Sequence, residues 1–175
     1  MIIGISGKMG TGKTTLADHL AKQLDGHRAS FADALRLEVG DYFGVPLEAM
    51  TNRYAKELTL VPVGYQYKSI RALLQWWGSL RREADKDYWA NKLISSIGWD
   101  EVVIIDDVRY QNEADAILRA GGSLVRLQPY PGWVSGEGGD HLSETDLDYY
   151  EYFDHVFKPE FGSLFHLAFK IKKMY

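Results

Sequence analysis

The chain has 175 residues, 46% of them hydrophobic, which suits one domain with a full core. Its 24 acidic residues outnumber its 20 basic ones. The net charge of −4 therefore disfavours non-specific nucleic-acid binding, in which Lys and Arg release counterions from phosphates. The absence of cysteine excludes disulfides and thiolate metal sites, and no apolar run approaches the roughly 20 residues of a membrane span. We therefore expect a cytoplasmic protein that binds neither nucleic acid nor membranes.

A phosphate-binding motif opens the chain. Residues 7–14 read GKMGTGKT and match G-x-x-x-x-G-K-[ST] at every fixed position. An apolar run over 1–5 precedes the motif as an expected strand, and a helical stripe of Leu and Ala follows it up to Gly26. A chance glycine-rich turn is the alternative, but this strand–loop–helix context favours a loop whose backbone N–H groups bind phosphate. The expected nucleotide-binding residues are Gly7, Met9, Gly10, Thr11, Gly12, Lys13, Thr14 and Thr15, with Lys13 on the β- and γ-phosphates and Thr14 on Mg²⁺.

Short apolar runs alternate with helical patterns along the rest of the chain, which predicts an α/β fold with a parallel sheet. We expect further strands over 28–31, 101–105, 123–128 and 152–157, and a loop over 60–67. Helices are expected over 33–43, 46–58, 69–77, 87–97, 111–120 and 163–174, with Gly78 ending the third. The fold class is then a three-layer α/β/α P-loop NTPase with about five parallel strands in the order 2-3-1-4-5. We expect 1–175 to be a single domain, with a helical insertion over 33–98 and a lid-like loop over 129–147.

A pair of acids follows the strand expected over 101–105. In phosphate-loop proteins an acid at the end of such a strand assists Mg²⁺ binding, whereas the alternative is an Asp that caps a helix. We prefer Asp107 for this role, with Asp106 completing the strand. Arg109, two residues later, suits the transferring phosphoryl group or an acceptor phosphate. A surface ion pair between Arg109 and Glu113 is its alternative.

The insertion is rich in arginine. A phosphate acceptor is already ionised, so transfer to it needs cations and alignment rather than a strong general base. The sequence provides arginines there and no evident base, which favours a phosphate acceptor over an alcohol. Each arginine taken alone is more often a solvated surface residue than a ligand. The arginines are Arg36, Arg53, Arg71, Arg81 and Arg82.

Three other side chains are candidates for substrate contacts. Gln75 shares a helix face with Arg71, and its amide could read a base edge, although a surface glutamine is as common. Trp89 could stack on a base, but such aromatics usually lie in a core. His141 could act as a base; it has no partner spaced to help it bind a metal.

These segments together resemble the bacteriophage deoxynucleoside monophosphate kinases. The resemblance runs through most of the chain and is carried by the combination and order of its motifs. They are the phosphate loop, residues 30–33 leading to Arg36, the Ser69–Gly78 pattern with Arg82, residues 87–89, Asp107-Val108-Arg109 before 112–114, and 141–144.

The resemblance implies transfer of a phosphoryl group from ATP, with Mg²⁺, to a deoxynucleoside monophosphate. By this resemblance Lys13, Asp107, Arg109 and Arg82 are catalytic, and Thr14 and Asp107 hold the metal. The implied substrate-binding residues are Asp33, Arg36, Arg71, Gln75, Arg82, Trp89, Arg109, His141 and Glu144. The turn at 158–162 departs from the Asn-Asp-Gly-like turn of the family, which leaves the adenine contacts open. The alternatives are a small-metabolite kinase of the same fold, of the phosphomevalonate or dephospho-coenzyme A type, and a non-kinase P-loop NTPase; the oligomeric state is open, with a homodimer as one alternative.

Overall fold

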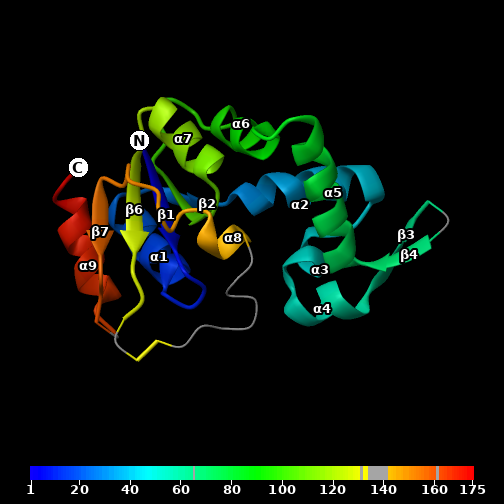
Figure 1. Cartoon of the computed structure of the whole chain (residues 1–175), viewed down its shortest axis with the longest axis horizontal. Helices are drawn as coiled ribbons and strands as arrows, with labels where there is room; N and C mark the ends of the chain where they lie inside the picture. The colour runs from blue at the N-terminus through cyan, green and yellow to red at the C-terminus, as the bar shows by residue number, and fades with distance from the viewer. Residues whose placement is uncertain (65, 131, 134–141, 161) are drawn as a thin grey trace. The chain divides into compact units, whose positions relative to one another are not determined.

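The computed structural model describes residues 1–64, 66–130, 132–133, 142–160 and 162–175, and the chain forms two compact units. The sheet unit comprises residues 1–30 and 93–175, and the helical unit comprises residues 31–92 (Figure 1).

A five-stranded parallel sheet is the centre of the sheet unit. Its strands are β1 (Ile2–Gly7), β2 (His27–Ala29), β5 (Val103–Val108), β6 (Ser123–Leu127) and β7 (His155–Phe157). They lie in the order β2-β5-β1-β6-β7, with every neighbouring pair parallel. This is the order 2-3-1-4-5 in terms of the five predicted strands, so the sequence prediction of the fold class is confirmed.

The two faces of the sheet are covered by different helices. Ile3 and Ile5 of β1 pack with α1 (Lys13–Gln23) and α9 (Leu164–Lys172) in one buried cluster. Gly4, which points the opposite way in the strand, lies against α7 (Gln111–Arg119); a Cβ there would be 2.6 Å from Ile117 Cδ1. Successive strand residues therefore contact opposite helical layers. The same alternation in β5 decides whether Asp106 or Asp107 faces α1.

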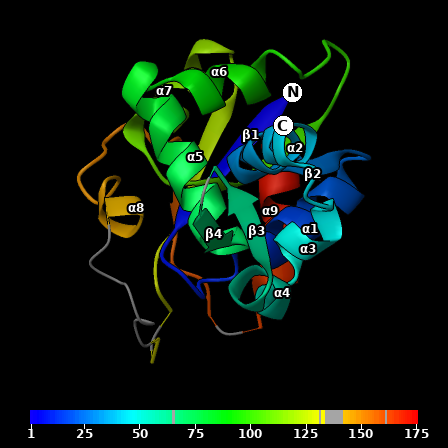
Figure 2. The same cartoon turned by 90° about the vertical axis from the view of Figure 1, so that its right-hand side faces the viewer.

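The helical unit contains α2 (Phe31–Phe43), α3 (Leu47–Thr51), α4 (Arg53–Leu58), the strands β3 (Leu60–Val63) and β4 (Gln66–Ser69), α5 (Ile70–Ala84) and the first residues of α6 (Tyr88–Ile94). Its core contains Val39, Met50, Leu73, Trp77 and Trp89, all nearly fully buried. Strands β3 and β4 form an antiparallel hairpin that contacts α5 (Figure 2).

Three sequence predictions for this unit were wrong. The single helix over 46–58 is two helices, because Asn52 is extended and its side chain accepts hydrogen bonds from Tyr54 N and Ala55 N, starting α4. The loop over 60–67 is the β3–β4 hairpin; Pro62 is tolerated because a two-stranded ribbon consists of edge strands, and Gly64 turns with φ +61°.

The third error concerns Gly78, which was predicted to end a helix. Helix α5 continues through it to Ala84, so Arg81 and Arg82 lie in the last turns of the helix and not in a loop. Gly78 is buried inside the helix, where its carbonyl accepts a hydrogen bond from Trp89 Nε1.

One buried carboxylate organises the helical unit. Glu38 of α2 accepts hydrogen bonds from Trp77 Nε1 at 2.8 Å and from Arg81 Nε at 2.7 Å, and further ones from Tyr88 and Lys92. Burial by itself would raise the pKa of Glu38, but the hydrogen bonds from Lys92, Tyr88, Arg81 and Trp77 outweigh it and lower this pKa from 4.5 to about 2. The charged form of Glu38 therefore joins three helices.

We expect Glu38→Gln to lower the free energy of unfolding by about 3 kcal/mol, because it leaves the buried Trp77 donor and two partly exposed cations beside a neutral group. Since the folded-state pKa lies below the ordinary value, the contribution of Glu38 is complete above pH 4.5 and is lost as the pH falls towards 2. Urea unfolding followed by tryptophan fluorescence at several pH values measures both effects. Glu48→Gln, an exposed acid of the same unit, is the control; equal stability of the two variants would contradict the role of Glu38.

Candidate active site

The phosphate-binding loop joins β1 to α1 in the sheet unit. Gly10 and Gly12 have φ values of +80° and +90°, a region that glycine adopts without strain, and Gly12 caps α1. Lys13 Nζ donates hydrogen bonds to the carbonyls of Gly7 at 2.8 Å and Lys8 at 2.9 Å, so its side chain folds back along the loop. Thr11 Oγ1 closes the turn by donating to the Lys8 carbonyl at 2.8 Å. The loop thus holds a cation beside the N-terminus of a helix, which suits a polyphosphate.

Lys13 has an altered proton affinity in this setting. Burial, assisted by the positive charge of Arg109, lowers the pKa of Lys13 from 10.5 to about 8, although Glu144 and Asp106 oppose the shift. The lysine ammonium is therefore poorly compensated in the absence of an anion, and a phosphate beside it would stabilise its charged form.

The acid that accepts a hydrogen bond from Thr14 is Asp106, and not Asp107, which the sequence favoured for the metal. Thr14 Oγ1 donates to Asp106 Oδ2 at 2.8 Å, and Asp106 is only 8% exposed. The reason is strand alternation: Asp106 shares a face of β5 with Ile104, which packs against α1, whereas Asp107 belongs to the opposite face. A hydroxyl and a carboxylate oxygen are the hard ligands that Mg²⁺ prefers, so this pair fits that ion.

Arg28 also reaches this acid from β2. Its Nη1 donates to the same Asp106 oxygen at 3.1 Å, and its Nε lies 3.4 Å from Asp18 of α1. Among the described residues no group of three or more His, Asp or Glu side chains could hold a metal by itself. A magnesium ion at Thr14 and Asp106 would therefore take its other ligands from water and substrate phosphates, as is usual for this ion.

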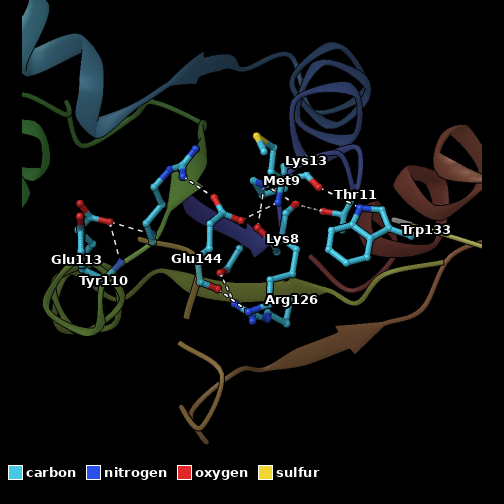
Figure 3. Close-up of polar contacts among 12 residues, drawn as sticks. Lys8, Met9, Thr11, Lys13, Tyr110, Glu113, Arg126, Trp133 and Glu144 are labelled. Atoms are coloured by element: carbon cyan, nitrogen blue, oxygen red, sulfur yellow. Dashed lines mark hydrogen bonds and ion pairs between the residues drawn. The ribbon is translucent and has the colours of Figure 1, made fainter. Parts of the chain in front are cut away.

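A second group of charges lies on the other side of the loop (Figure 3). Glu144 of α8 (Leu142–Thr145) accepts a hydrogen bond from the Met9 backbone N–H at 2.7 Å and another from Arg109 Nη1 at 2.7 Å. Glu113, which the alternative interpretation paired with the Arg109 side chain, accepts a hydrogen bond from the Arg109 backbone N–H at 2.8 Å and caps α7. The structure thus brings Arg109 and Glu144 to the loop.

Three further residues line the loop that the sequence analysis did not select. Arg126 of β6 donates to Ser6 Oγ at 2.8 Å and to Asp148 Oδ1 at 2.8 Å, and Asp148 also binds the Lys8 ammonium. Trp133 Nε1 donates to the Met9 carbonyl at 2.9 Å. A signal for Arg126 was available, since it is a charged residue between Val125 and Leu127 in an otherwise apolar strand.

Two of the arginines predicted to bind the substrate form ion pairs within the helical unit. Arg36 binds Asp33 one turn away on α2, and Arg71 of α5 pairs with Glu57 of α4.

Gln75 is exposed on α5 one turn from Arg71, and Arg82 is half-buried near the end of that helix. Trp89 is 2% exposed, so it lies in the core, which was the alternative to stacking on a base. Little of its ring is left for a base to contact. His141 lies outside the described residues.

No protein-family model matches the chain. A protein of Acanthamoeba polyphaga mimivirus with the name "Putative deoxynucleotide monophosphate kinase" is 30% identical over 163 residues, covering 84% of this chain and 82% of the relative. The chain belongs to the P-loop kinase family of this relative. An uncharacterized protein, ORF77, of Ictalurid herpesvirus 1 is 26% identical over 154 residues, and the kinase chain spans 59% of that relative's length.

Solved structures of other kinases share the fold. Shikimate kinase from Acinetobacter baumannii superimposes with a TM-score of 0.58 at 16% identity, over 99% of this kinase and 91% of that chain. Dephospho-CoA kinase from Campylobacter jejuni gives a TM-score of 0.54 at 14% identity, over 98% and 95% of the two chains. Within the described residues, no helix of the kinase is both long enough and apolar enough to cross a membrane.

Proposed function

We propose that this kinase transfers the γ-phosphoryl group of ATP to the phosphate of a deoxynucleoside 5'-monophosphate, with Mg²⁺ as cofactor, giving the diphosphate. The observation that carries the proposal is the 30% identity to the mimivirus protein along most of both chains, in a molecule whose phosphate loop has an adjoining acid. The arginine-rich sequence of residues 31–92 supports a phosphate as the acceptor, because joining two anions requires positive charge.

The chain's own residues would act on the donor as follows. The loop N–H groups and the N-terminus of α1 bind the β- and γ-phosphates, and Lys13 neutralises the charge that develops between them. Thr14 and Asp106 would hold Mg²⁺, which when bound supplies charge neutralisation and alignment of the phosphates. Arg109 binds the equatorial oxygens of the phosphoryl group once its guanidinium is turned from Glu144.

The acceptor-binding residues are proposed to lie in the helical unit. Arg36, Arg71 and Arg82 would bind the acceptor phosphate, and the Gln75 amide would read the base edge from the same helix face as Arg71. An ionised phosphate needs no strong base for attack, so these residues act by binding and alignment.

Arg71→Ala is expected to raise KM for the acceptor by about tenfold, with a smaller change in kcat, because it removes binding common to the ground and transition states. Initial rates with varied acceptor measure this change. Glu57→Gln is the matched control, since it breaks the ion pair with Arg71 but keeps the arginine. An effect confined to KM for ATP, or one reproduced by Glu57→Gln, would remove Arg71 from the acceptor site.

An acceptor panel tests the proposed function. With ATP and Mg²⁺ in every reaction, the deoxynucleoside monophosphates are compared with dephospho-coenzyme A, phosphomevalonate and a reaction without acceptor. We expect ADP release to depend on a deoxynucleoside monophosphate. Turnover with one of the two metabolites alone would support a small-metabolite kinase, and acceptor-independent hydrolysis alone would support a non-kinase NTPase.

A further inference from the structure

Two carboxylates from one short segment contact the phosphate loop and its neighbouring arginines. Glu144 places one oxygen 2.7 Å from Met9 N, a loop amide, and the other 2.7 Å from Arg109 Nη1. The side chain of Glu144 is only 8% exposed, whereas that of Arg109 is 39% exposed, so the contact is buried on the side of the carboxylate and open to solvent on the side of the arginine. Figure 3 shows Glu144 directed at the loop beside Met9 and Lys8.

Asp148 repeats this arrangement four residues later. One of its oxygens accepts from the Lys8 ammonium, and the other accepts from Arg126 Nη2 at 2.8 Å. Lys8 Nζ also donates to the backbone carbonyl of Glu144, so this one lysine holds the segment at both Glu144 and Asp148. Each carboxylate therefore bridges one donor of the loop and one arginine, Arg109 directly after β5 or Arg126 within β6.

These donors are of the kind that bind phosphoryl oxygens. Backbone N–H groups of a phosphate loop and arginine guanidinium groups recognise carboxylates and phosphates by the same charge-assisted hydrogen bonds. A carboxylate and a phosphate cannot occupy one set of donors together, and two anions at that distance repel each other. The bound segment is thus in competition with any anion that uses Met9 N and Arg109.

We propose that residues 144–148 form an anionic plug that occupies phosphate-binding donors and must leave them when a polyphosphate binds. The plug lowers the apparent affinity for the polyphosphate, because only the fraction of molecules whose donors are free of the plug can bind it. Its departure frees Arg109 and Arg126 for phosphoryl oxygens, so donor binding prepares the cations that transfer requires. The identity of the polyphosphate as ATP rests on the proposed function; the competition itself does not.

Calorimetric titration of the full chain with inorganic triphosphate, and separately with ATP, tests the plug. The variants are Glu144→Gln, which removes the charge, Glu144→Ala, which removes the side chain, and Asp148→Asn; Glu151→Gln, an exposed acid nearby, is the matched control. We expect Glu144→Gln and Glu144→Ala to bind inorganic triphosphate about fivefold more tightly than the unmodified chain, Asp148→Asn to shift the same way, and Glu151→Gln to bind unchanged. A gain in affinity cannot come from damage to the fold.

The outcomes separate this inference from the proposed function. Unchanged or weaker triphosphate binding by both Glu144 variants would overturn the plug and leave Glu144 as a residue that supports the bound ligand. Tighter triphosphate binding by these variants, in a chain that does not bind ATP, would uphold the plug and contradict the proposed function.

Discussion

Lys13→Ala should lower kcat for phosphoryl transfer by at least about 100-fold, the effect typical of removing one preorganised donor from a developing negative charge. This lysine donates hydrogen bonds to the carbonyls of Gly7 and Lys8, and its pKa is lowered to about 8, chiefly by burial. Keeping Lys13 protonated in this buried position therefore costs free energy, and a bound phosphate would offset that cost. Because these contacts lie within one loop, we expect the thermal unfolding of the variant to stay close to that of the unmodified kinase.

Rates of ADP formation with saturating acceptor measure the effect, and thermal unfolding monitors the fold. Lys22→Ala is the matched control, since Lys22 is an exposed lysine on the same helix. Activity of Lys13→Ala within a few-fold of that of Lys22→Ala would show that the loop does not carry the reaction.

Asp106→Asn should reduce activity by about 10- to 100-fold and shift the Mg²⁺ dependence to higher concentrations, and Asp107→Asn should do so less. The reason is that Asp106, and not its neighbour, accepts the hydrogen bond from Thr14. The amide keeps the shape of the side chain but removes the negative charge that a divalent cation requires.

Initial rates against Mg²⁺ concentration, at fixed ATP and acceptor, distinguish the two variants. Calorimetric titration with Mg²⁺–ATP adds a readout that does not depend on turnover. If Asp107→Asn were the variant with the larger shift in Mg²⁺ dependence, the assignment of Asp106 to the metal would be wrong.

The sheet and the phosphate loop could be predicted because local signals determined them. The strands β1, β5 and β6 are short runs rich in apolar residues, and the loop motif fixes the position of β1 and α1 together. The order of the strands followed from the fold class that the motif indicated. Arg109 and Glu144 were likewise selected from sequence, although their contact with each other depends on a separation of 35 residues.

Other features depended on tertiary contacts that one sequence does not display. The sequence does not distinguish Asp106 from Asp107, because both faces of a buried parallel strand are apolar. The pattern therefore does not show which face of β5 packs against α1. Gly78 has the appearance of a helix end, yet it is buried within α5, where its carbonyl accepts a hydrogen bond from Trp89 Nε1. Asp148 gave no signal because its partners, Lys8 and Arg126, are far from it in the chain.

Transfer of label from ATP radiolabelled in its γ-phosphate to a deoxynucleoside monophosphate is the decisive measurement for the proposed phosphoryl transfer. We expect a labelled deoxynucleoside diphosphate that forms in proportion to ADP, with Mg²⁺ present, and that is lost in Lys13→Ala. Label that appears only as inorganic phosphate, or in no deoxynucleotide at all, would refute the proposed function.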